Sequence, residues 1–252
     1  MTTDGWSPPF SLKEKLRHSL IPASLQLRWR VRRALRRGEP ELALLPELVD
    51  PHRVAIDVGA NSGVWSWSLL RVAREVHAFE PNPKMFSRLK AALGNQVHLH
   101  TVALSDTAGE AEFIVPLTKR GYSNQHGSLS RMGADGAHGI VKVQTCRLDD
   151  LDIRDVGFIK VDVEGFECAV LAGAVETLKR ERPVLVVELE ERHTGRPIAD
   201  LIREVESYGY AGSAWFNGRL TPWQEIDLDT FHTRAVETPR YVFNFVFRPL
   251  AV

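Results

Sequence analysis

The sequence predicts an α/β protein: a mostly parallel, seven-stranded sheet with helices on both faces, preceded by a helical N-terminal arm. Between residues 54 and 208, short apolar runs alternate with segments whose apolar residues recur at helical spacing. Two further strand patterns follow, at 210–216 and 241–248. Alternation of this kind places crossover helices on both faces of a parallel sheet. A chain of 252 residues accommodates one such domain with extensions.

Residues 1–49 form the predicted arm. Its helical pattern is broken at Pro22, and the first half places Leu12, Leu16 and Leu20 on one face. A basic amphipathic helix of this kind can cap its own domain, contact a second copy of the chain or lie on an anionic membrane surface. A cap or a homodimer contact is favoured, and peripheral membrane contact is the alternative.

The charge of the chain is zero overall but unevenly distributed. Residues 1–38 hold nine Lys and Arg against two acidic residues, so the remainder has an excess of seven negative charges. That excess argues against a nucleic-acid partner. Cys146 and Cys168 lack metal-ligand spacing and are expected to be small apolar residues in a reducing compartment. Since we see no signal-peptide core or membrane-spanning apolar run, we expect a cytoplasmic protein, with the inner membrane face as a peripheral contact.

The first strand pattern, at 54–58, introduces the segment on which the functional prediction depends. The run ends around Asp57, and a turn containing Gly59, Asn61 and Gly63 leads into a helical pattern. Because glycine has no Cβ, we expect both glycines to let the loop backbone approach a ligand closely. The helix that follows would offer its free N–H groups to a negatively charged group.

A second strand pattern, at 75–79, ends at Glu80. An acid at about this offset accepts hydrogen bonds from ribose hydroxyls in nucleotide-binding α/β units, so we expect an adenosine-containing cofactor. Asn61 stands where a dinucleotide fingerprint has its second glycine, and Asp57 would repel a pyrophosphate. S-adenosylmethionine carries an ammonium, a carboxylate and a sulfonium but no phosphate. The local charge therefore favours S-adenosylmethionine over NAD.

A helix is predicted at 83–93 and a third strand at 97–102. Ala103, Leu104 and Asp106 follow at the carboxyl end of that strand, where open α/β sheets bind ligands. Asp106 could accept a hydrogen bond from an adenine amino group, or it could be an ordinary turn residue.

An insert at 116–139 separates two later strand patterns. Loops of this length are uncommon in compact domains and are usually functional. The insert contains polar residues suited to hydrogen-bonding a polyhydroxylated acceptor, including Tyr122, Asn124 and His126. We expect it to lie over the cofactor as a lid.

The rest of the core domain, residues 50–252, continues the alternation. Strands are predicted at 156–163 and 183–190, each followed by a helix, at 166–180 and 197–208. The two final strand patterns would add an antiparallel pair at one edge of the sheet.

Two pairs of acids stand at the ends of these later strands: Asp162 with Glu164, and Glu188 with Glu190. In an extended chain, side chains at i and i+2 share a face, so each pair can point into one pocket. Unpaired charges are costly to bury, so a site explains these acids better than packing does. For Glu190 alone, which precedes further charged residues, a solvated loop position is favoured.

Methyl transfer to a hydroxyl requires an oriented acceptor and a base for its proton. Asp162 is the first candidate, and His126 and His193 are alternatives because histidine titrates near neutral pH. A divalent metal held by Asp162, Glu164 and Glu188 is conceivable, since hard cations prefer oxygen ligands. No metal-loop spacing supports it, and no metal is expected.

Several motifs resemble the FkbM family of methyltransferases over about residues 50–190. They occur in the order of that family: Asp57–Gly63, Glu80–Asn82, Ala103–Asp106, Leu148–Leu151 and Ile159–Glu167. The resemblance implies a Rossmann-like class I methyltransferase fold with S-adenosylmethionine as cofactor. It also implies O-methylation of a hydroxyl, often on a sugar, glycolipid or polyketide.

The resemblance further implies which residues bind the cofactor, and these lie within the same motifs: Asp57, Gly59, Ala60, Asn61, Gly63, Glu80, Pro81, Ala103, Leu104, Asp106 and Asp162. Glu164 would join Asp162 near the transferred methyl group. Acceptor contacts are expected from Glu188, Glu190, Tyr122 and Asn124. The identity of the acceptor stays open, because the arm and the segment after about residue 195 lie outside the common pattern.

Two other classes of function compete with methyl transfer. A nicotinamide-dependent oxidoreductase is disfavoured by Asn61 in the loop and by Asp57 before it. A non-catalytic protein that keeps the cofactor fold is disfavoured by the complete set of acids.

Overall fold

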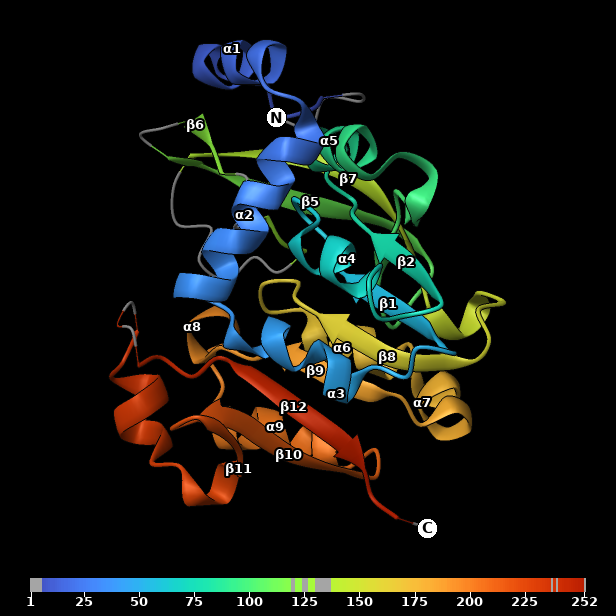
Figure 1. Ribbon diagram of the computed structural model, residues 1–252, viewed down its shortest axis with the longest axis vertical. Coiled ribbons are helices and arrows are strands. Elements are labelled where there is room, and N and C mark those ends of the chain that lie inside the picture. The colour runs from blue at the N-terminus through green and yellow to red at the C-terminus, as the bar shows by residue number, and fades with distance from the viewer. Residues whose placement is uncertain are drawn as a thin grey trace.

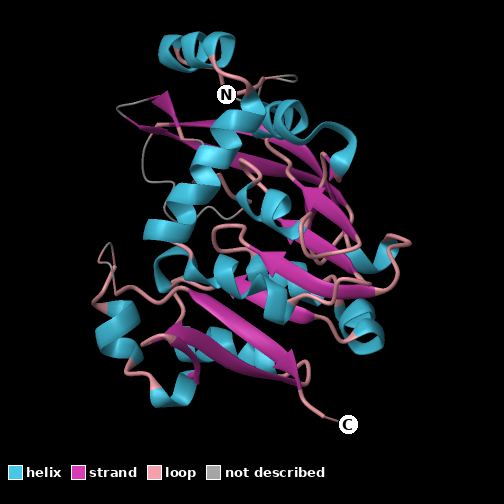
Figure 2. Cartoon of the chain, viewed as in Figure 1, coloured by secondary structure: helices cyan, strands magenta, loops and turns pink. Residues whose placement is uncertain are grey.

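An eight-stranded sheet lies at the centre of the computed structural model (Figure 1, Figure 2), which describes residues 6–118, 121–123, 127–129, 137–236, 238 and 240–251. Its strands lie in the order β11-β10-β12-β9-β8-β1-β2-β3. Their bounds are β1 Val54–Val58, β2 Glu75–Phe79, β3 His98–His100, β8 Val156–Val161, β9 Val184–Glu188, β10 Tyr210–Phe216, β11 Arg219–Pro222 and β12 Asn244–Pro249.

The five strands β3, β2, β1, β8 and β9 are parallel, and β12 runs antiparallel between β9 and β10. A mostly parallel sheet with an antiparallel end was predicted, but its count of seven strands is one too low. The eighth strand is β11, Arg219–Pro222, which folds back on β10 after a turn at 217–218. The parallel strands all end at the same edge, which brings the acids after them together (Figure 1).

Helices cover both faces of this sheet (Figure 2). The α-helices are α1 Leu12–Leu20, α2 Ala23–Arg37, α3 Leu45–Leu48, α4 Val64–Leu69, α5 Pro83–Leu93, α6 Glu167–Ala172, α7 Val175–Glu181, α8 Glu191–Thr194 and α9 Ile198–Glu206. Single turns of other helix types are η1 Pro40–Leu44, η2 Gly94–Gln96, η3 Leu148–Asp150, η4 Trp223–Glu225 and η5 Asp229–Thr233. The predicted helix at 166–180 is thus two helices, α6 and α7.

Successive residues of a strand point to opposite faces of the sheet, so they pack into two separate hydrophobic cores. Ile56 of β1 faces the core that includes residues of α6, α7 and α9, whereas its neighbour Ala55 faces the core that includes residues of α2, α4 and α5. All five residues of β1 are buried, as expected for a strand in the middle of a parallel sheet.

A second sheet packs beside the first, with strand order β4-β7-β5-β6. Its strands are β4 Ala103–Leu104, β5 Gly109–Thr118, β6 Gly121–Tyr122 and β7 His138–Cys146. The insert at 116–139 is therefore not entirely loop, because β5 continues to Thr118 and β7 begins at His138. Residues 119–120, 124–126 and 130–136 of the insert lie outside the described residues.

The N-terminal arm contacts the domain mainly through α2. Leu27 and Val31 are buried against α4 and α5. By contrast, α1 buries none of its residues, and Leu12, Leu16 and Leu20 are 86%, 64% and 73% exposed. None of the described helices combines the length and the apolar content that crossing a bilayer requires.

Candidate active site

A cavity of about 1290 Å³ opens at the carboxyl ends of β1, β2, β8 and β9, and residues of α2 in the arm line one side of it. Asp57, Glu80, Asp162, Glu164 and Glu188 all line it. A single small-molecule site commonly occupies about 300–1,000 Å³. The cavity is therefore large enough for a cofactor and an acceptor side by side.

The loop after β1 has the conformation that its glycines permit, and each glycine also lies close to a neighbouring protein element. Gly59 has a φ of +82°, and a Cβ on it would lie 1.8 Å from the carbonyl oxygen of Asp162. Gly63 has a φ of +85°, and a Cβ there would lie 2.6 Å from Cδ1 of Leu89. Both glycines therefore allow close packing against neighbouring protein elements. The helical pattern behind them covers 64–73, but the helix itself is shorter, since α4 ends at Leu69.

Asp57 is a buried acid beneath this loop, with only 1% of its surface exposed. Ser66 donates a hydrogen bond from Oγ to Oδ2 of Asp57 at 2.5 Å. Burial raises the pKa of Asp57 to about 6, while that hydrogen bond and the charge of Lys160 oppose the rise.

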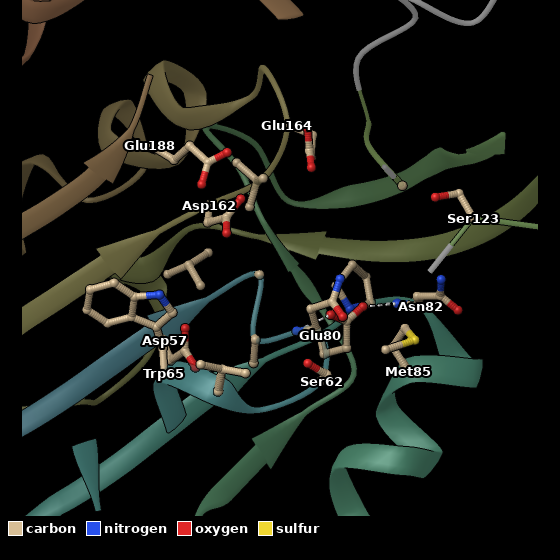
Figure 3. A pocket seen from close by; sticks show the side chains of 18 of the residues that line it. Asp57, Ser62, Trp65, Glu80, Asn82, Met85, Ser123, Asp162, Glu164 and Glu188 are labelled. Carbon is tan, nitrogen blue, oxygen red and sulfur yellow. Dashed lines mark hydrogen bonds between the residues drawn. The ribbon is translucent and has the colours of Figure 1, made fainter. Parts of the chain in front are cut away.

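Glu80 lies at the end of β2, on another side of the cavity from Asp162 and Glu188 (Figure 3). Its two carboxylate oxygens accept hydrogen bonds from the backbone N–H groups of Asn82 (2.8 Å) and Asn61 (2.6 Å). Burial raises the pKa of Glu80 to about 7, and these two bonds lower it. Glu80 thus joins the first loop to the second strand, and its oxygens retain lone pairs for a ribose.

The remaining predicted cofactor residues differ in their placement. Ala60, Pro81, Ala103 and Leu104 line the cavity with mostly apolar surface. Asp106 is not among the lining residues, and its Oδ1 accepts from the neighbouring hydroxyls of Ser105 and Thr107.

Asp162 and Glu188 point toward one another from the ends of β8 and β9 (Figure 3). Burial raises the pKa of Asp162 to about 7; the ammonium of Lys160 opposes this rise, and Glu164 adds to it. Burial and the charge of Asp162 raise the pKa of Glu188 well above its usual range. Both carboxyl groups therefore retain their protons to higher pH than exposed carboxyl groups do.

The cation between these carboxylates is Lys160, a residue that sequence reasoning passed over. Its side chain is fully buried in β8, with Nζ 2.9 Å from Oδ1 of Asn244 and 4.0 Å from Oε2 of Glu188. Burial disfavours its charge, but the carboxylates, Asp162 first, raise its pKa overall. The signal was in the sequence: a lysine inside an apolar strand is rarely buried without a partner.

A second group of charged side chains surrounds Glu164, which has an unusual left-handed φ of +58°. The Nε2 atom of His193 lies 3.0 Å from Oε2 of Glu164 and 3.8 Å from Oε2 of Glu190. Glu190 is buried rather than solvated, contrary to the favoured expectation, because Arg192 folds back and donates from Nη2 at 2.8 Å. Glu190 and Arg192 both line the cavity.

Of the insert residues predicted to act, Tyr122 lines the cavity and packs edge-on against Trp6, with ring centroids 4.9 Å apart. Asn124 and His126 lie outside the described residues.

A metal site would require several ligand atoms within reach of one ion. Among the described residues, the group of His, Cys, Asp and Glu side chains close enough to share an ion is Glu75, His77 and His98, at the β2–β3 edge of the sheet. Oε2 of Glu188 instead lies 4.0 Å from the ammonium of Lys160.

The donor set fits a cationic nucleoside without phosphates. Buried acids at the ends of β1 and β2 match an ammonium and ribose hydroxyls, and they would repel a pyrophosphate. Sheet order and site together define a class I S-adenosylmethionine-dependent methyltransferase domain. The family model for the methyltransferase FkbM domain matches residues 57–211, and the chain belongs to this family.

Curated relatives include the 2-O-methyltransferase NoeI of Sinorhizobium fredii, 28% identical over 159 residues (54% of this chain, 63% of the relative). The hexuronic acid methyltransferase AglP of Haloferax volcanii is 31% identical over 180 residues, which are 66% of each chain. The chain thus spans about two thirds of the length of these relatives.

Two crystal structures show the same fold. The methyltransferase FkbM from Methylobacillus flagellatus KT superposes with a TM-score of 0.52 at 18% identity, covering 79% of this chain and 44% of that one. SMU.1697c of Streptococcus mutans, in complex with S-adenosylhomocysteine (SAH), gives 0.50 at 11% identity, covering 84% and 97%. Family membership favours methyl transfer over the nicotinamide-dependent alternative.

Proposed function

We propose that the chain is an O-methyltransferase that methylates a hydroxyl of a saccharide, glycolipid or related natural product. The observation that carries the proposal is the pair of carboxyl groups, Asp162 and Glu188, that line a cavity with room for two ligands, with the buried Lys160 4.0 Å from Oε2 of Glu188. The named activities of NoeI and AglP, methylation at a 2-O position and of a hexuronic acid, support a saccharide acceptor.

The cofactor half of the cavity would be formed by the loops after β1 and β2. Glu80 would accept hydrogen bonds from ribose hydroxyls, and Asp57 would favour the ammonium of the methionine part. Ala103 and Leu104 provide apolar surface for the adenine. When bound, S-adenosylmethionine supplies an electrophilic methyl group on a positively charged sulfur.

The proposed base is Asp162. A carboxylate whose pKa is about 7 is ionised in part at neutral pH and still accepts a proton readily, which is the balance that general-base catalysis requires. Lys160 keeps an ionised form of the pair available, because its ammonium stabilises a negative charge on either carboxyl group. Asp162 would thus accept the proton of the acceptor hydroxyl while Glu188 helps to orient that hydroxyl.

His193 is the alternative base among the described residues, because Glu164 lies 3.0 Å from its Nε2 and would stabilise its protonated form. Glu190 and Tyr122 line the acceptor side in this proposal.

The test combines binding and turnover. Calorimetry should show binding of SAH and none of NADH, and SAH should accumulate when S-adenosylmethionine is supplied with saccharide acceptors. Asp162→Asn should lower kcat far more than it changes the affinity for SAH, whereas His193→Gln should retain turnover. Binding of NADH alone would refute the proposal. Tight SAH binding with no turnover on any saccharide would favour the non-catalytic alternative.

The division into an arm, residues 1–49, and a catalytic domain, residues 50–252, is part of the proposal. The exposed leucines of α1 would contact a second copy of the chain or, alternatively, the inner face of the membrane. Deleting residues 1–21 separates these contacts: a shift from dimer to monomer supports the first, and loss of binding to anionic liposomes the second. If neither changes, the role given to α1 is wrong.

A further inference from the structure

Arginines from three elements line one side of the cavity: Arg17 of α1, Arg30 and Arg33 of α2, and Arg88 of α5. Arg88 lies six residues beyond Asn82 along the sequence, so it stands about 9 Å further along α5 than the residue that binds Glu80. The cavity therefore has an acidic part at the strand ends and a basic part under the arm.

The basic part has more positive charge than its surroundings balance. Among the described residues, none forms a hydrogen bond or ion pair with the guanidinium of Arg17, Arg30 or Arg33. Arg88 approaches Glu14 at 3.8 Å, but the same carboxylate is 3.1 Å from Nζ of Lys84. One acid thus faces several cations.

Each of these guanidinium groups also destabilises the positive charge of its neighbours. Burial lowers the pKa of Arg30 to about 10, and the charges of Arg88 and Arg17 contribute to the same shift. Burial and the charge of Arg17 likewise lower the pKa of Arg88. A bound anion would remove this repulsion, because it would neutralise charges that the described part of the protein leaves unbalanced.

We propose that these arginines form a subsite for a phosphate or diphosphate group, so that the acceptor of the proposed methyl transfer is a phosphorylated saccharide. The inference rests on the proposed function. Arginine suits this role because its planar guanidinium binds phosphate oxygens in pairs. The excess of more than one positive charge matches a group of about two negative charges better than a single carboxylate.

The arrangement would also orient the acceptor. Asp162 and Glu188 repel an anion, whereas Arg30 and Arg88 attract it, so a saccharide phosphate enters with its phosphate under the arm and a hydroxyl toward the carboxyl pair. A nucleic-acid phosphate is disfavoured, because the rest of the chain carries the excess negative charge.

The binding test uses pyrophosphate as the probe. Calorimetric titration of the full chain, saturated with SAH at fixed ionic strength, should show pyrophosphate binding. Arg30→Gln should weaken this binding about tenfold or more, because it removes a charge-assisted hydrogen bond to the phosphate. Arg30→Lys should recover part of this loss. The matched control is Arg32→Gln, an exposed residue of the same helix that does not line the cavity; it should change the affinity less than about twofold. Absent binding, or equal losses in both Gln variants, would refute the subsite.

The turnover test separates this inference from the proposed function. A phosphorylated saccharide should be methylated with a higher kcat/KM than its dephosphorylated form or a uronic acid, and Arg30→Gln should remove that preference. Equal kcat/KM for all three acceptors would refute the inference and leave the methyltransferase proposal standing. A fall in SAH affinity in Arg30→Gln would instead assign the arginines to the cofactor and refute the subsite. Pyrophosphate binding without methylation of any saccharide would refute the proposed function alone.

Discussion

Replacing Lys160 with Met removes the buried cation between the two carboxyl groups of the cavity. Lys160 Nζ lies 4.0 Å from Oε2 of Glu188. Two unit charges at that distance interact by about 4 kcal/mol at an effective dielectric constant of about 20, which is equivalent to about three pKa units. Lys160→Met should therefore raise the pKa of the carboxyl pair by one to three units.

The sign of the stability change follows from the raised pKa values. Below about pH 6 Asp162 is largely protonated in both proteins, so the loss of Lys160 removes little attraction to it. Above pH 7 Asp162 of the wild type is largely ionised, while Asp162 of the variant must retain its proton. The destabilisation of the variant should thus grow by about 1.4 kcal/mol per pH unit until the new pKa is reached.

The measurement is urea unfolding at pH 5, 7, 8 and 9, together with the pH dependence of SAH production. In Lys160→Met, the part of the pH profile in which kcat/KM rises with pH should move to higher pH. Lys179→Met, which breaks an exposed pair with Glu176, is the control and should shift neither quantity. Unfolding curves that stay parallel to those of the wild type at every pH, or an unmoved pH profile, would refute the role given to Lys160.

Three further predictions concern the cofactor loops. Glu80→Ala should weaken SAH binding about tenfold by calorimetry, because it removes a charged acceptor of hydrogen bonds; an unchanged Kd would exclude Glu80 from the site. Asp57→Asn should be as stable as the wild type near pH 4 but more stable at pH 8, by up to about 3 kcal/mol. The reason is that the pKa of Asp57 is raised to about 6, so its ionisation destabilises the wild-type fold as the pH rises. Urea unfolding at both pH values tests this prediction. Gly59→Ala should lower the free energy of unfolding, measured by thermal unfolding, by more than about 3 kcal/mol, since its Cβ would overlap Asp162. Gly218 has the same φ of +82° but open space around it, so Gly218→Ala should lower that free energy by only about 1–2 kcal/mol. Equal costs for the two glycine variants would contradict the packing role.

Much of the fold could be predicted, because apolar periodicity records burial directly. The five parallel strands and the two strands of the predicted antiparallel pair, β10 and β12, form near the predicted positions. The apolar pattern could not reveal which strands pair with which. The short, polar β11 carries no strong strand signal, and the patterns of β5 and β7 did not indicate that these strands belong to a second sheet. Strand order depends on contacts between residues far apart in sequence.

The acids of the site could be located because charges at the ends of apolar strands are conspicuous. Their partners could not. Lys160 faces Asn244 across 84 positions of sequence, and Glu190 is buried only because Arg192 turns back on it. Arg30 and Arg88 meet only once α2 packs on α5. Contacts of this kind between side chains can be identified only from the three-dimensional arrangement of the elements that carry them.

The position of β12 has a consequence for how the chain is made. Residues 244–249 insert between β9 and β10, although both of those strands leave the ribosome earlier. Until the last strand arrives, β9 has an open edge in the sheet and Lys160 has no Asn244 to hold it. A truncated product covering only 57–211 would expose that edge and would be prone to associate with other copies, so expression trials should retain the C-terminal strand.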